Sequence, residues 1–142
     1  MIENAEIIIE GNSIEYDSIN VLGSESDKIL KEYFAEDQIL SSKWNVLKLE
    51  YDKYVESNDT INRKKIALKL NKIQQVDRIE LLKRYVSENS TSTVGALLPA
   101  FCTIENSLTE KDYKEIYNTF SENIKQTDYG QRIFKKFERT EE

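Results

Sequence analysis

The stretch from Leu30 to Tyr54, LKEYFAEDQILSSKWNVLKLEYDKY, decides the fold of this chain. Along it an apolar or aromatic residue recurs at alternating spacings of three and four, with one exception at Asp37. The positions are Leu30, Tyr33, Asp37, Leu40, Trp44, Leu47, Tyr51 and Tyr54. This heptad spacing places the side chains on one face of a helix. The pattern predicts one long helix over about 25–57 whose apolar face packs against a partner.

A second helical pattern follows a short break at Ser57-Asn58-Asp59. It covers residues 60–88, and Asp59 or Thr60 is expected to cap its start. Its apolar face consists of Ile66, Leu70, Ile73, Val76, Ile79, Leu82, Tyr85 and Val86. Because the break is short, we expect the two long helices to lie antiparallel as a hairpin.

Two or three shorter helices are expected after the long pair. The apolar stretch 94–104 predicts the most buried of them, with a kink at Pro99. Thr109 begins a helix-start box, and Thr127 or Asp128 is expected to cap a last helix. These helices are needed because a single helical hairpin buries too little apolar surface to offset the entropy lost on folding.

The first 23 residues predict extended chain. A β-branched run at Ile7–Ile9, a turn at Gly11-Asn12-Ser13 and alternation from Ile14 to Leu22 together predict a β-hairpin. Two strands alone are marginal in water, so this hairpin needs the helices, another copy or missing strands as a partner. The predicted fold is therefore mainly α, with a β-hairpin at 1–23 and a helical domain at 24–142.

The composition excludes several kinds of active site. The chain has 142 residues, no histidine and a single cysteine. It cannot build a Ser-His-Asp triad, a His-ligated metal site, a CxxC redox pair or an intrachain disulfide. A net charge of −6 disfavours binding to nucleic acid. No apolar run approaches the roughly 20 residues of a membrane span, and no signal peptide is present. We therefore expect either a cytoplasmic protein or a piece of a longer one.

The lone Cys102 has two interpretations. It could be a reactive or resolving thiol, or a small buried apolar residue, as free cysteines often are. The chain has no histidine, and no lysine or arginine adjoins Cys102 in sequence to lower its pKa. Burial is the favoured interpretation.

Acidic side chains form three groups that could supply paired carboxylates or a cation site. They are Glu32, Glu36 and Asp37; Glu50 and Asp52; and Glu138, Glu141 and Glu142. A solvated helix face is the favoured interpretation of all of them except Asp37. Asp37 lies on the apolar face, where it either interrupts the helix or pairs with a basic residue of the second helix and sets the register.

Aromatic side chains follow the same helix and could form a ligand groove or a partner surface. They are Tyr33, Phe34, Trp44, Tyr51 and Tyr54. Their helical spacing favours core packing. The glycines Gly11, Gly23, Gly95 and Gly130 are scattered, so no phosphate-binding loop is predicted. We predict no catalytic, cofactor-binding or metal-binding residue and no cofactor.

Three stretches of the chain carry a resemblance to a known family. They are Val21-Leu22-Gly23-Ser24-Glu25-Ser26-Asp27; Tyr85-Val86-Ser87-Glu88-Asn89-Ser90-Thr91-Ser92; and Tyr117-Asn118-Thr119-Phe120 with Thr127-Asp128-Tyr129-Gly130-Gln131. Residues 5–138 resemble the N-terminal region of Bacteroidetes-type AhpC/TSA, TlpA-like thiol–disulfide oxidoreductases. In that family a small β domain of unknown function and a helical segment precede a thioredoxin domain. Ser90 stands where the family usually has proline.

The resemblance implies a fragment without the thioredoxin domain and without most of the β domain. It implies a bacterial protein of the periplasm or cell envelope whose redox activity belongs to the missing part. This chain alone would then be a non-catalytic accessory domain that serves as a spacer, a dimerisation surface or a site of partner recognition. The alternatives are a free-standing helical protein–protein interaction module and, third, a small ligand-binding protein or enzyme.

Overall fold

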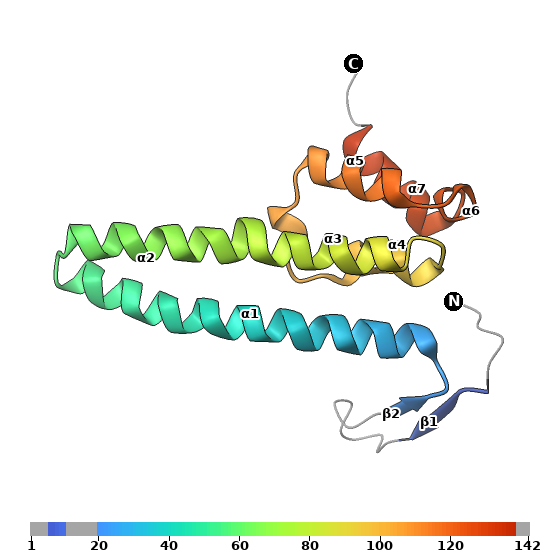
Figure 1. Cartoon of the computed structure of the whole chain (residues 1–142), viewed down its shortest axis with the longest axis horizontal. Coiled ribbons are helices and arrows are strands. Elements are labelled where there is room, and N and C mark those ends of the chain that lie inside the picture. Colours follow the sequence, from blue (N-terminus) through green and yellow to red (C-terminus); the bar gives the residue numbers. More distant parts are fainter. Residues whose placement is uncertain (1–5, 11–19, 139–142) are drawn as a thin grey trace.

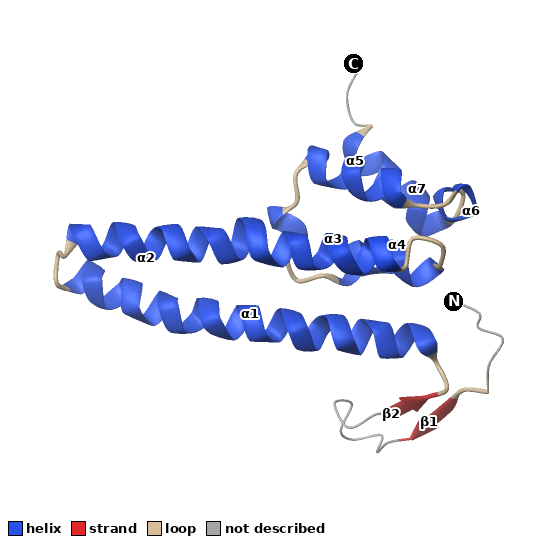
Figure 2. Ribbon diagram, in the orientation of Figure 1, coloured by secondary structure: helices blue, strands red, loops and turns tan. Residues whose placement is uncertain are grey.

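The computed structural model of the chain describes residues 6–10 and 20–138, and this part is mainly helical, as predicted (Figures 1 and 2). The strands lie at the N-terminal end, before the first helix. In chain order the elements are β1 (Ile8–Glu10), β2 (Asn20–Leu22), α1 (Glu25–Glu56), α2 (Thr60–Lys72), the π-helical segment η2 (Ile73–Asp77), α3 (Arg78–Glu88), α4 (Thr93–Phe101), the 3₁₀ turn η3 (Glu105–Ser107), α5 (Glu110–Thr119), α6 (Glu122–Lys125) and α7 (Asp128–Phe137).

Strands β1 and β2 pair antiparallel, with Glu10 opposite Asn20. The predicted turn at Gly11-Asn12-Ser13 lies outside the described residues. Gly23 links β2 to α1 with a φ of 84°, a left-handed conformation that glycine adopts without a Cβ clash.

Helix α1 begins and ends close to the predicted limits. The hydroxyl of Ser24 accepts a hydrogen bond from the Asp27 N–H at 3.1 Å and caps the start of α1. Asp59 caps α2 in the same way through the Asn62 N–H, also at 3.1 Å. Helices α2 and α3, joined by η2, form one rod that lies alongside α1 (Figure 1).

The π-helical segment η2 is the main departure from the predicted second helix. The N–H of Arg78 bonds to the carbonyl of Ile73, five residues back instead of four. The extra residue in this turn shifts the apolar face. Val76, predicted on that face, is 41% exposed, while Arg78 is only 8% exposed. The prediction for Val76 was therefore wrong, because it assumed an uninterrupted α-helix.

The apolar stretch predicted as one helix is divided. Helix α4 ends at Phe101, two residues after Pro99. Cys102 takes an extended conformation, and its thiol donates to the carbonyl of Pro99 at 3.3 Å. Ile104 therefore lies beyond the helix, although it stays buried. The expected single helix through residue 104 was wrong.

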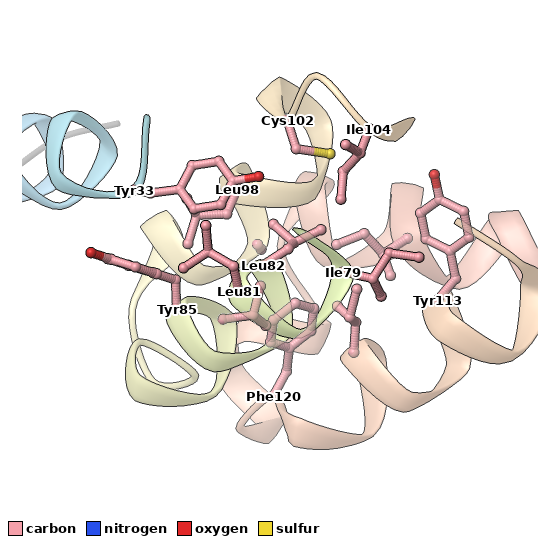
Figure 3. Packing of buried hydrophobic residues seen from close by; sticks show 14 of the residues in the cluster. Tyr33, Ile79, Leu81, Leu82, Tyr85, Leu98, Cys102, Ile104, Tyr113 and Phe120 are labelled. Atoms are coloured by element: carbon pink, nitrogen blue, oxygen red, sulfur yellow. The ribbon is translucent and has the colours of Figure 1, made fainter. Parts of the chain in front are cut away.

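The core lies at one end of the long rod, where α4 and α5 pack against α3 and α7 packs against α4, α5 and α6 (Figure 1). Its largest members pack together in Figure 3, among them Tyr33 of α1 and Leu82 of α3, both fully buried. Thr109 and Asp112 cap α5 reciprocally, and Thr127 caps α7, as predicted. These caps satisfy backbone N–H groups at the starts of two core helices.

Candidate functional site

A buried ion pair joins the two long helices at the π-helical segment. Asp37 of α1 faces Arg78, the first residue of α3, across a bidentate contact: Nε to Oδ1 is 2.7 Å and Nη2 to Oδ2 is 2.6 Å. The side chains are only 6% and 9% exposed respectively. This outcome selects one of the two interpretations of Asp37, a pairing with a basic residue of the second helix.

The pair continues into a network that includes the segment after α4. Thr103 donates its hydroxyl to Asp37 Oδ2 at 3.1 Å and also accepts from Arg78. Nη1 of Arg78 donates to the side-chain oxygen of Gln74 at 3.0 Å, and the side-chain amide of Gln74 donates to the hydroxyl of Ser107 at 2.8 Å. One arginine thereby connects α1, η2 and the turn beyond α4.

This network has the properties of a structural clamp. Its charged groups are desolvated but satisfied by several hydrogen bonds, the condition under which a buried pair is tolerated. The hydrogen bonds to Asp37 are the largest influence on Arg78 and raise its pKa despite burial. A π turn is common at functional positions, and here it orients Arg78 toward α1.

Tyr33 and Cys102 lie next to the clamp. In Figure 3 the hydroxyl of Tyr33 points into the cluster on the side of Cys102. Tyr33 is fully buried, and its hydroxyl has no hydrogen-bond partner in the described part of the chain. Burial, together with the neighbouring Cys102 and Asp37, raises the Tyr33 pKa. Burial also raises the Cys102 pKa to about 11, so this thiol is neutral and unreactive at neutral pH.

The other acidic candidates do not converge. Glu36 accepts hydrogen bonds from Tyr85 at 2.7 Å and from Arg84, and these hold its pKa below the usual value. Asp52 pairs with Lys48 on the surface of α1. Glu32, Glu50 and Glu138 are exposed, and Glu141 and Glu142 lie outside the described residues. Within the described ranges, no group of three His, Cys, Asp or Glu side chains could hold a metal ion.

The aromatic candidates follow the packing interpretation. Tyr33 contacts Tyr85 edge-on, with ring centroids 5.6 Å apart. Trp44, Tyr51 and Tyr54 are partly buried. Phe34, in contrast, is 37% exposed. No aromatic ligand groove is formed by these side chains as a set, because they are distributed along the whole of α1.

A different groove runs along α1 and was missed in the sequence. It measures about 660 Å³ and is bordered almost entirely by apolar surface. Its lining consists of Gln38, Ile39, Ser42, Lys43, Val46, Leu47 and Ile73. Ile39 and Val46 are both 58% exposed. Their seven-residue spacing beside the heptad face was the available signal.

The identity of Arg78 was also missed. The sequence indicated that Asp37 could pair with a basic residue but did not say which one. In an uninterrupted α-helix, residues next to Arg78 would face α1. The π turn brings Arg78 onto that face instead, and no simple sequence pattern marks such a turn. Of the described helices, none is long and apolar enough to cross a membrane.

Comparisons with protein-family models, with curated proteins and with solved structures find no match for this chain.

Proposed function

We propose that this chain is a non-catalytic helical interaction module, and that it acts as the accessory region of a cell-envelope thiol–disulfide oxidoreductase. In this proposal residues 1–23 are the remnant of a small β domain, and residues 24–142 are a helical domain built on a long antiparallel hairpin. The redox cysteines belong to a C-terminal thioredoxin-like domain of a periplasmic parent protein. The family assignment has its support in the three resembling stretches of sequence.

The observation that carries the interaction role is the open apolar groove beside α1. Exposed large apolar side chains that share one concave surface are typical of protein-binding sites. Ile39 and Val46 lie along one wall of this groove, and Ile73 of η2 contributes from the opposite rod. An amphipathic helix laid into such a groove would cover the exposed side chains of Ile39 and Val46.

The environment of Cys102 supports the non-catalytic part of the proposal. A redox-active thiol needs a lowered pKa and access to its substrate. Cys102 is 8% exposed, and its pKa is raised to about 11. Its thiol is occupied in a hydrogen bond to the Pro99 carbonyl.

A second copy of the chain is the occupant that the groove favours. The part of α1 that lines the groove is symmetric about the Ser42–Lys43 bond. Ile39 lies three residues before Ser42, and Val46 lies three residues after Lys43. Two such helices crossing antiparallel at Ser42–Lys43 would place Ile39 of one copy against Val46 of the other, twice. A self-complementary surface of this kind is what a two-fold dimer requires.

Light scattering coupled to size-exclusion chromatography tests this dimer. The wild-type chain should be dimeric at tens of micromolar, on the order expected for a modest interface. Val46→Glu would place a carboxylate in the groove of both copies and should weaken dimerisation by about 100-fold or more. Leu68→Glu is the matched control, because Leu68 is 71% exposed on α2 and does not line the groove.

Three results would contradict parts of the proposal. A strict monomer at high concentration would exclude a second copy as the occupant. Equal weakening by Leu68→Glu would show that the groove is not the interface. Insulin reduction by the isolated chain that disappears in Cys102→Ser would exclude the non-catalytic assignment.

The runner-up is a free-standing interaction module whose family likeness is accidental. The same groove supports it, so the dimer experiment does not separate the two. The reading frame downstream of Glu142 does: continuation into a CxxC-bearing domain supports the oxidoreductase, and a stop codon supports the free-standing module.

A further inference from the structure

A second concave site is lined by different residues, mostly from the core helices α4, α5 and α7. It encloses about 360 Å³, at the small end of the range for ligand pockets. Its lining residues are Ala96, Pro99, Ala100, Glu105, Tyr113, Tyr129, Arg132, Ile133, Lys135 and Lys136. The proposed interaction role does not use this pocket.

The floor of the pocket is apolar and firmly packed. Ala96 is fully buried, Ile133 is 4% exposed, and Pro99 belongs to the most buried side chains of the described part. The small side chain of Ala96 leaves space where a larger residue would fill the pocket. Tyr113, which is 6% exposed, adds an aromatic side. Such a floor suits a flat apolar body.

The α7 wall is strongly basic. Lys136 is neutralised by Glu105, whose carboxylate lies 2.8 Å from its Nζ. Arg132 stacks on the Tyr129 ring at 5.2 Å from the centroid. Neither Arg132 nor Lys135 forms an ion pair with any residue of the described ranges. These two cations give the pocket a local positive charge, although the net charge of the chain is −6.

The two tyrosines supply polar groups that the protein leaves open. The hydroxyls of Tyr113 and Tyr129 have no hydrogen-bond partner among residues 6–10 and 20–138. Burial is the largest cause that raises the Tyr113 pKa to about 12, so its hydroxyl stays a donor at neutral pH. The pocket therefore combines two cations, two phenol donors and an apolar floor.

We propose that this pocket binds a small aromatic carboxylate, with the carboxylate held by Arg132 and Lys135 and the ring lying over the floor formed by Ala96, Pro99 and Ile133. The guanidinium offers the paired donors that a carboxylate accepts best. The apolar floor provides the remaining affinity by desolvation of the ring. This is a ligand site independent of the groove on α1.

Titration of the ¹⁵N-labelled full chain with 2-naphthoate, followed by two-dimensional NMR, tests the proposal. Saturable shifts are expected in amides of α4, α5 and α7. The neutral 2-naphthamide should bind at least about tenfold more weakly, because it lacks the charge that the basic wall recognises. Arg132→Gln combined with Lys135→Gln should weaken 2-naphthoate by a similar factor of about ten.

Two further variants keep the result interpretable. Lys64→Gln combined with Lys65→Gln removes the same charge from exposed positions of α2 and should leave binding unchanged. Ala100→Phe fills the pocket from an exposed position without removing a charge, and should abolish binding even if the double variant at Arg132 and Lys135 fails to fold. Absent saturation, equal binding of the amide, or equal weakening by the α2 variant would overturn the proposal.

Discussion

The two ends of the long helix pair follow the same sequence pattern but are packed very differently. In the first half of α1, Tyr33 and Asp37 are buried, and beyond Asp37 no residue of α1 is. In the second rod, α2 has two buried residues and α3 has six. We call the half near the α1–α2 turn the outer end and the half at α3 the inner end.

The cause of the difference is a third layer. At the inner end α4 packs against α1 and α3, α5 packs against α3, and α7 lies against α4 and α5, whereas the outer end of the described chain has two helices only (Figure 1). Two helices alone can bury only the side chains along the line where they touch, so Trp44 and Leu47 are only partly buried. A heptad pattern therefore indicates which face packs, but not how completely it is covered.

The largest effect should come from the clamp at the boundary of the two ends. Arg78→Ala leaves the carboxylate of Asp37 buried without its partner, and we expect a loss of about 3–5 kcal/mol in the free energy of unfolding. Urea denaturation followed by circular dichroism measures it. The double variant Asp37→Leu, Arg78→Met removes both charges and should recover most of the loss. If the double variant were no better than Arg78→Ala, the clamp would not act as an ion pair.

A matched pair of leucines compares the two ends directly. Leu82 of α3 is fully buried, so Leu82→Ala should cost about 2–5 kcal/mol. Leu47 of α1 is only partly buried at the outer end, and Leu47→Ala should cost about 1 kcal/mol, because this side chain buries less apolar area on folding than Leu82 does. The same urea experiment serves both. Similar losses would mean that the outer end is covered in solution, as the proposed dimer would cover its groove side.

Much of the fold could be predicted from local sequence signals. The limits of α1 follow from the break at residues 57–59 and the cap at Ser24, because both are determined by adjacent residues. The start of α5 at Thr109 is equally local. The π turn at Ile73–Asp77 could not be predicted, since it depends on Arg78 reaching a carboxylate 41 residues earlier in the chain.

The candidate sites were predictable only in part. Asp37 was identified because a charge interrupts an apolar face, which is visible in a periodic pattern. The pocket among α4, α5 and α7 was not identified, because Arg132 and Lys135 come beside Pro99 and Tyr113 only when these helices pack together. The spacing of residues within one helix cannot indicate which side chains of other helices will pack against it. The β1–β2 register was not predicted from the sequence either, since strand pairing is non-local.

The smallest expected effect on stability comes from removing single ion pairs, one at the inner end and one at the outer end. At the inner end Lys83 of α3 donates to Asp112 at 2.6 Å, and the Thr109 N–H donates to the same carboxylate at 2.9 Å. Asp112→Asn should cost about 1 kcal/mol at neutral pH, because a partly buried charged hydrogen bond is lost. Asp52→Asn removes an exposed pair with Lys48 at the outer end and should cost less than about 0.5 kcal/mol.

The pH dependence of the difference identifies the origin of the Asp112 effect. Burial alone would raise the Asp112 pKa, but the bonds from Lys83 and Thr109 outweigh it and hold the pKa below its ordinary value. The charged form thus stabilises the fold above the unfolded pKa of about 3.9, and this contribution is lost as the pH falls through the lower folded value. Stability curves of wild type and Asp112→Asn should therefore converge on acidification. A difference that persisted after Asp112 is protonated would assign the effect to packing, and the inner end would then owe none of its advantage to charge at this contact.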